Sequence, residues 1–156
     1  MILERELEGC AVATERPVLV LPVPGEVAWP ELGGPLRAEL PAGAPADLGH
    51  ARGRDIVVDA DEVHLPLVVR SWRAGDVMRP LGMAGRRKLQ DLFADLKVPR
   101  PARSGVPIVV DDTGEVVWVV GCALGERFKV TASTRNWLRL VWEGDLCPLP
   151  SALDEP

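Results

Sequence analysis

The chain has 156 residues, of which 47% are hydrophobic and 26% are charged, and these proportions exclude wholesale disorder and a collagen-like fibre. Glycine and proline contribute 15 residues each, which favours many turns and short elements over a helical bundle. The net charge of −5, taken alone, suggests no nucleic-acid partner, and three widely spaced cysteines and two histidines give little support to a disulfide framework, a zinc site or a Ser-His-Asp triad.

Residues 1–60 are predicted to form short β-strands separated by turns. Apolar or alternating runs at residues 18–21, 27–29 and 36–40 stand between prolines and glycines, as is typical of strands. Residues 42–54 are rich in Ala, Gly and Pro and have no apolar period. We interpret them as a flexible linker and place a soft domain boundary there.

Residues 61–145 are predicted to form a second, mainly β region with one firm helix. Within residues 86–97, Leu89, Leu92, Phe93 and Leu96 follow the i, i+3, i+4, i+7 spacing of an amphipathic helix. The helix is expected to end near residue 97, because a proline at 99 disfavours helical backbone in the preceding residue.

The remaining elements of this region are strands. Residues 106–110 and 115–121 are predicted to form a β-hairpin around an Asp-Asp-Thr-Gly turn, because Gly114 can take a left-handed conformation. The fold class is therefore α+β with a β-sandwich-like core. Further strands are expected at residues 56–60, 65–72 and 137–142, and residues 146–156 are expected to be a tail.

The charge of the chain is unevenly distributed. Residues 70–103 hold nine Lys/Arg against three Asp/Glu, whereas residues 1–69 hold five against twelve and residues 104–156 hold four against eight. One interpretation is a surface on which the basic segment forms salt bridges with the acidic flanks. The other is a docking face for an anion such as a phosphate backbone.

Motifs for catalysis are absent from the sequence. It contains no P-loop, no G-x-G-x-x-G, no H-E-x-x-H and no G-x-S-x-G. Asp111 and Asp112 could bind a divalent ion, but an exposed hairpin turn is the favoured interpretation. Cys122 follows an apolar run and is interpreted as a buried small residue. No apolar run is long enough to span a membrane and the first residues do not resemble a signal peptide, so a cytoplasmic protein is expected.

The segment from residue 70 to 83, Arg-Ser-Trp-Arg-Ala-Gly-Asp-Val-Met-Arg-Pro-Leu-Gly-Met, combines arginines, a tryptophan and turn formers. It is followed by K-L-Q-D-L-F at 88–93, K-V-P-R at 97–100, P-I-V at 107–109, W-V-V-G at 118–121 and E-R-F-K-V-T at 126–131. In this order and spacing, residues 65–141 resemble the C-terminal domain of bacterial tRNA(Ile)-lysidine synthetase.

The resemblance implies part of an ATP-dependent ligase that attaches lysine to the wobble cytidine of an isoleucine tRNA. In that family an N-terminal domain with an S-G-G-x-D-S loop performs the chemistry and would hold ATP and Mg, and this sequence contains no such loop. No cofactor is therefore expected on this chain, and alone it should be inactive. Its implied partners are the catalytic domain, in cis or in trans, and the tRNA, chiefly its acceptor stem. A protein-interaction domain without nucleic-acid binding is the alternative.

Cations of the basic segment are the candidate contacts to tRNA phosphates. Arg86, Arg87 and Lys88 lie at the N-terminus of the expected helix, before its apolar stripe, and should be exposed. The helix dipole disfavours cations there unless an anion is near. Arg70 is expected to pair with Asp76 or Asp91 inside the fold, and Trp72 to pack in the core. The candidate nucleic-acid-binding residues are Arg73, Arg79, Arg86, Arg87, Lys88, Lys97, Arg100 and Arg103.

Overall fold

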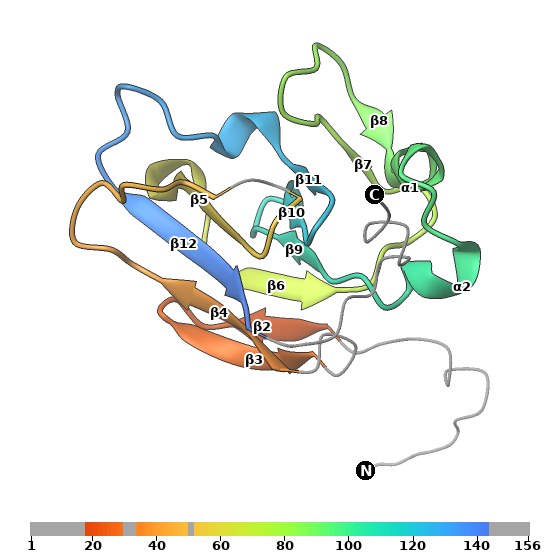
Figure 1. The fold of residues 1–156 in the computed structure, drawn as a ribbon, viewed down its shortest axis with the longest axis horizontal. Helices are drawn as coiled ribbons and strands as arrows, with labels where there is room; N and C mark the ends of the chain where they lie inside the picture. Colours follow the sequence, from red (N-terminus) through yellow and green to blue (C-terminus); the bar gives the residue numbers. More distant parts are fainter. Residues whose placement is uncertain (1–17, 30–33, 50–51, 144–156) are drawn as a thin grey trace, which may run out of the picture.

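A computed structural model describes residues 18–29, 34–49 and 52–143, and its fold consists of two larger antiparallel sheets, with a two-stranded ribbon and a small helical layer beside them (Figure 1). The predicted tail at 146–156 lies outside these residues. No helix in the described ranges is long and apolar enough to cross a membrane. The α+β class is confirmed.

The first sheet has five strands, each antiparallel to its neighbours. Its centre is the predicted hairpin, whose two strands pair as Val119 with Ile108 and Val116 with Val110. Gly114 closes the turn with φ +90°, a conformation that favours glycine. In spatial order the strands are β11 (Ala123–Leu124), β10 (Val116–Val119), β9 (Ile108–Val110), β6 (Leu67–Arg70) and β2 (Leu19–Leu21).

The second sheet has four strands in the order β3 (Gly25–Trp29), β4 (Gly34–Glu39), β12 (Trp137–Trp142) and β5 (Asp55–Asp59). In β12 the side chains of Leu138, Leu140 and Trp142 are buried and the intervening ones are half-exposed. This alternation is that of a strand with one face against a core. It confirms the strand predicted at 137–142.

The main core lies between the two sheets. It joins residues of the first sheet, such as Val69 and Trp118, to residues of the second, such as Leu36, Val58 and Leu140. A second core lies on the other face of the five-stranded sheet, where Ile108, Val116 and Val119 pack with the helical layer. Every residue of β10 is buried because its sheet is covered on both faces.

The boundary predicted at residues 42–54 falls in a loop within this packed unit. Leu19–Leu21 pairs with β6, so a strand from the first predicted region belongs to the five-stranded sheet. In the other direction, β12 pairs with both β4 and β5. Strands from the two sides of the predicted boundary therefore share both sheets and one core.

The predicted helix exists but is shorter than expected. Helix α1 covers Leu89–Asp95, and Leu89, Leu92 and Phe93 are buried as predicted, whereas Leu96 is half-buried. At its end the N–H of Lys97 donates to Ala94 and the N–H of Val98 donates to Phe93, with Lys97 at φ +62°. This is a Schellman ending, which stops the helix before the proline.

The residues before α1 are not helical, which corrects the expected N-terminus. Strand β8 (Arg87–Lys88) pairs with β7 (Val77–Met78) in a two-stranded ribbon. The three cations at 86–88 therefore lie on a strand and its approach. The structure also contains elements that were not predicted, namely the four-residue helix α2 (Arg100–Arg103) and the 3₁₀ turns η3 (Ala60–Glu62) and η4 (Glu126–Phe128).

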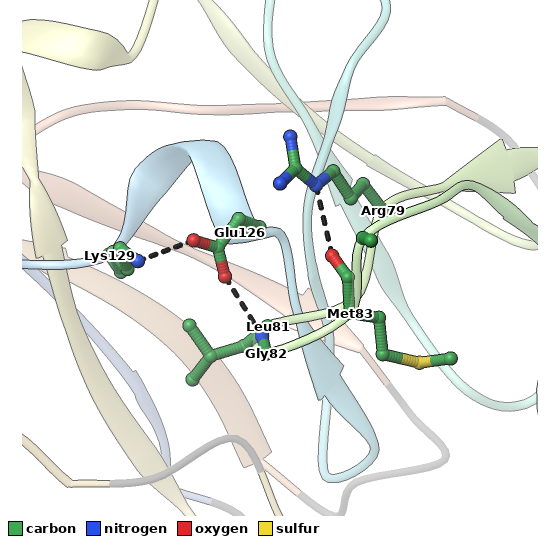
Figure 2. Close-up of a pocket in the computed structure, with 7 residues that line it drawn as sticks. Arg79, Leu81, Gly82, Met83, Glu126 and Lys129 are labelled. Carbon is green, nitrogen blue, oxygen red and sulfur yellow. Dashed lines mark hydrogen bonds and ion pairs between the residues drawn. The ribbon is translucent and has the colours of Figure 1, made fainter.

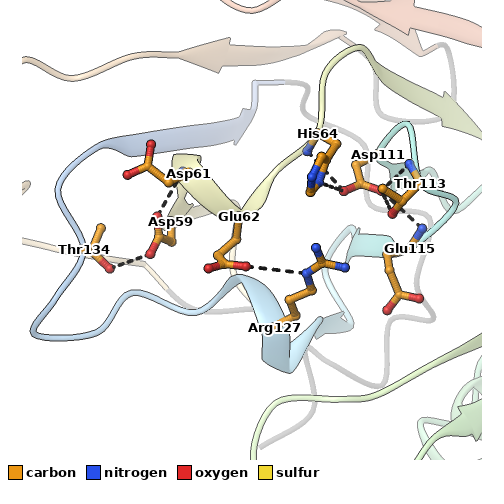
Figure 3. A network of polar contacts seen from close by, with 9 residues as sticks. All are labelled: Asp59, Asp61, Glu62, His64, Asp111, Thr113, Glu115, Arg127 and Thr134. Atoms are coloured by element: carbon orange, nitrogen blue, oxygen red, sulfur yellow. Dashed lines mark hydrogen bonds and ion pairs between the residues drawn. The ribbon is translucent and has the colours of Figure 1, made fainter.

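The favoured interpretation of Asp111 as an exposed turn residue is wrong, because its side chain is buried within the hairpin turn (Figure 3). Its carboxylate accepts hydrogen bonds from the Thr113 hydroxyl and from the N–H groups of His64, Thr113 and Glu115. Burial alone raises the pKa of Asp111, but these hydrogen bonds outweigh it and hold the pKa below its ordinary value. Asp111 is therefore a structural cap for the turn.

Candidate nucleic-acid interface

The basic segment is built on the β7–β8 ribbon and on helices α1 and α2, which lie together at one end of the molecule (Figure 1). One ion pair fixes the start of this segment. Arg70, at the end of β6, donates from both terminal nitrogens to the carboxylate of Asp76, at 2.9 and 3.0 Å. The backbone carbonyl of Asp76 accepts the N–H of Leu89, which begins α1. The expected internal role of Arg70 is confirmed.

Two candidate cations have acidic partners. Arg86 forms an ion pair with Glu115 at 3.0 Å, and Arg87 forms one with Asp95 at 2.6 Å. The expectation that all three cations at 86–88 are exposed holds for Arg86 and Lys88, whereas Arg87 is half-buried. Arg86 and Arg87 can therefore bind an anion only by sharing or leaving a carboxylate.

Five other cations are exposed and have no carboxylate within ion-pair distance among the described residues. Lys88 directly precedes α1 and Lys97 follows its C-cap, so the two lysines stand at opposite ends of the helix. Of the three aspartates in residues 70–103, Asp91 has no ion pair among the described residues. We call the five cations the basic face; they are Arg73, Arg79, Lys88, Lys97 and Arg100.

Arg103 is buried, unlike the other candidate cations. It is 8% exposed, its Nε donates to the carbonyl of Val98 at 2.9 Å, and its guanidinium lies 5.7 Å from the ring centroid of Phe93. The same ring packs edge-on against Trp72, which is half-buried as part of the second core, as expected. Because Arg103 is committed to this packing, it is not included in the basic face.

The first of the two charge interpretations is not what the described residues show. Of the ion pairs formed by residues 70–103, one reaches an acidic flank, and it joins Arg86 to Glu115. The other two, Arg70 with Asp76 and Arg87 with Asp95, lie inside the segment. Among the described residues, the cations of this segment are thus seldom paired with the acidic flanks.

A loop at residues 79–86 extends the interface toward η4 (Figure 2). The Nε of Arg79 donates to the carbonyl of Met83, and the carboxylate of Glu126 accepts the N–H of Gly82 and pairs with Lys129. The Gly82 N–H, followed by the Lys129 ammonium, holds the pKa of Glu126 below its ordinary value. Glu126 is thereby an acceptor that fixes the loop.

Behind this loop lies a hollow of about 340 Å³. Two candidate cations line it, Arg79 and Arg86, and they are joined by Arg127, which the sequence analysis missed. Arg127 also lies 3.6 Å from Glu62 (Figure 3). Its place beside the loop depends on η4 lying against the 79–82 turn, where the N–H of Glu126 donates to the carbonyl of Arg79, and local sequence does not signal this contact.

The described residues include no group of three or more His, Cys, Asp or Glu that could hold a metal ion. Cys122 is buried, as expected. The residues that converge at this end of the molecule are guanidinium and ammonium groups with paired carboxylates. Such cationic groups can bind and orient a polyanion.

Comparison with known proteins connects this geometry to a family. The family described as "TilS substrate C-terminal domain" matches residues 67–142. A solved structure, "Crystal structure of TILS C-terminal domain", superimposes with a TM-score of 0.72 at 30% identity and covers 82% of this chain and 96% of that chain.

Curated relatives give the same result. A tRNA(Ile)-lysidine synthase of Symbiobacterium thermophilum is 45% identical over 121 residues, covering 76% of this chain and 24% of the relative. Another, of Geobacter sulfurreducens, is 37% identical over 114 residues, covering 72% and 24%. The chain thus spans about a quarter of the length of these relatives. It belongs to the tRNA(Ile)-lysidine synthase family and matches the C-terminal domain of that enzyme.

Proposed function

We propose that this chain holds the tRNA for a lysidine synthase and that it binds the acceptor stem through the basic face. The observation that carries the proposal is the set of five exposed cations, Arg73, Arg79, Lys88, Lys97 and Arg100, which form no ion pair in the described ranges. Unpaired cations on a rigid scaffold are the usual contacts to a phosphate backbone.

The chemistry of an RNA duplex fits such a face. A-form RNA offers a wide, shallow minor groove with 2′-hydroxyls and regularly spaced phosphates, and proteins recognise it mainly by shape and charge. The basic face has cations at both ends of α1 and on the approach to β7, so it can contact several phosphates at once. Binding by this domain alone should depend little on sequence, because phosphates carry no sequence information.

Catalysis belongs to another part of the enzyme in this proposal. The ligase reaction, in which ATP activates the wobble cytidine and lysine displaces AMP, needs a nucleotide-binding loop, and the sequence has none. ATP and Mg would bind the catalytic domain, which is the second proposed partner, in cis or in trans. We place the complex in the cytoplasm, where tRNA is modified.

The proposal is tested by titrating the 156-residue chain with a fluorescent RNA stem at several salt concentrations. With five phosphate contacts, the slope of log K against log salt should be about −4. Reversing Lys88, Lys97 and Arg100 together to Glu should reduce the slope by roughly three contacts and abolish measurable binding at about 0.15 M salt. Circular dichroism checks that the variant is folded.

The single variant Lys88→Glu has a control of equal charge change in Arg135→Glu. Arg135 is exposed on the segment before β12, away from the basic face, and has no ion pair among the described residues. The Arg135→Glu variant should bind the stem as the parent does. If the triple variant binds as tightly as the parent, the basic face is not the RNA interface and the protein-interaction alternative takes its place.

A further inference from the structure

We draw no further inference here: the strongest candidate, the hollow behind the loop at residues 79–86 that is lined by Arg79, Arg86 and Arg127, belongs to the interface already described, and the carboxylates of Glu115 and Glu126 that line it as well give it no ligand chemistry of its own.

Discussion

Arg70 and Asp76 form a bidentate ion pair, with nitrogen-to-oxygen distances of 2.9 and 3.0 Å, at the point where the five-stranded sheet gives way to the basic segment. The side chains are 12% and 14% exposed. Asp76 also accepts the N–H of Arg73 at 2.6 Å. One carboxylate thus joins the end of β6 to the turn that presents the first cation of the basic face.

The first prediction concerns this pair. Arg70→Lys keeps the charge but removes the two-pronged geometry, so the free energy of unfolding in urea should fall by about 1–2 kcal/mol. Arg86→Lys is the control, because Arg86 pairs with Glu115 at a more exposed position and should change stability by less than about 0.5 kcal/mol. If the two variants lose the same stability, the bidentate geometry of Arg70 does not stabilise the fold beyond an ordinary exposed ion pair.

The strands and the hairpin could be predicted because their signals are local. Alternation of Leu138, Leu140 and Trp142 indicates a half-buried strand, and Gly114 after three turn-forming residues indicates a hairpin. The β7–β8 ribbon could not be predicted, since strands of two residues have no period. The apolar stripe begins at Leu89, and extending the helix back to residue 86 went beyond that signal.

The site was less predictable than the fold. Sequence indicates that residues 70–103 are basic, but the pairing of each cation depends on tertiary contacts. Arg70 could be assigned because Asp76 is close along the chain. The partner of Arg86 is 29 residues away, and Arg127 reaches the loop through η4. The structure was therefore needed to tell which cations of residues 70–103 form ion pairs and which do not.

Lys97 offers a second prediction, because it has the left-handed backbone conformation, φ +62°, that favours glycine. Lys97→Gly should raise the free energy of unfolding by about 0.5 kcal/mol, the relief of backbone strain being partly offset by the freedom of glycine in the unfolded chain. The same change should weaken binding to RNA, since it removes a cation. In Ala94→Gly, within α1, stability should instead fall by about 1 kcal/mol.

A third prediction concerns pH. The pKa of Asp111 is held below its ordinary value of 3.8 in the folded protein. The folded state therefore binds fewer protons than the unfolded state near this pH, and the contribution of Asp111 is present above about pH 4 and is lost as pH falls through its folded pKa. Asp111→Asn should lower stability at pH 7 and flatten the acid dependence, measured by urea unfolding between pH 7 and pH 3.

The control for the acid dependence is Asp112→Asn, because Asp112 is the exposed neighbour of Asp111 in the same turn. Its unfolding curve should follow that of the parent at each pH. If Asp111→Asn and the parent lose stability equally on acidification, the hydrogen bonds from Thr113, His64 and Glu115 do not couple folding to the ionisation of Asp111.

The last prediction separates two arginines at the two ends of α2. Arg103 is buried against Phe93 and donates to the Val98 carbonyl, so Arg103→Ala should cost about 2 kcal/mol of stability through lost packing and an unsatisfied carbonyl. The salt slope for RNA binding by the Arg103→Ala variant should remain that of the parent. Arg100→Ala should instead leave the free energy of unfolding within about 0.5 kcal/mol of the parent and reduce the salt slope by nearly one contact. If Arg103→Ala also reduces the slope by one contact, its side chain turns outward to a phosphate when RNA binds, and the basic face includes it.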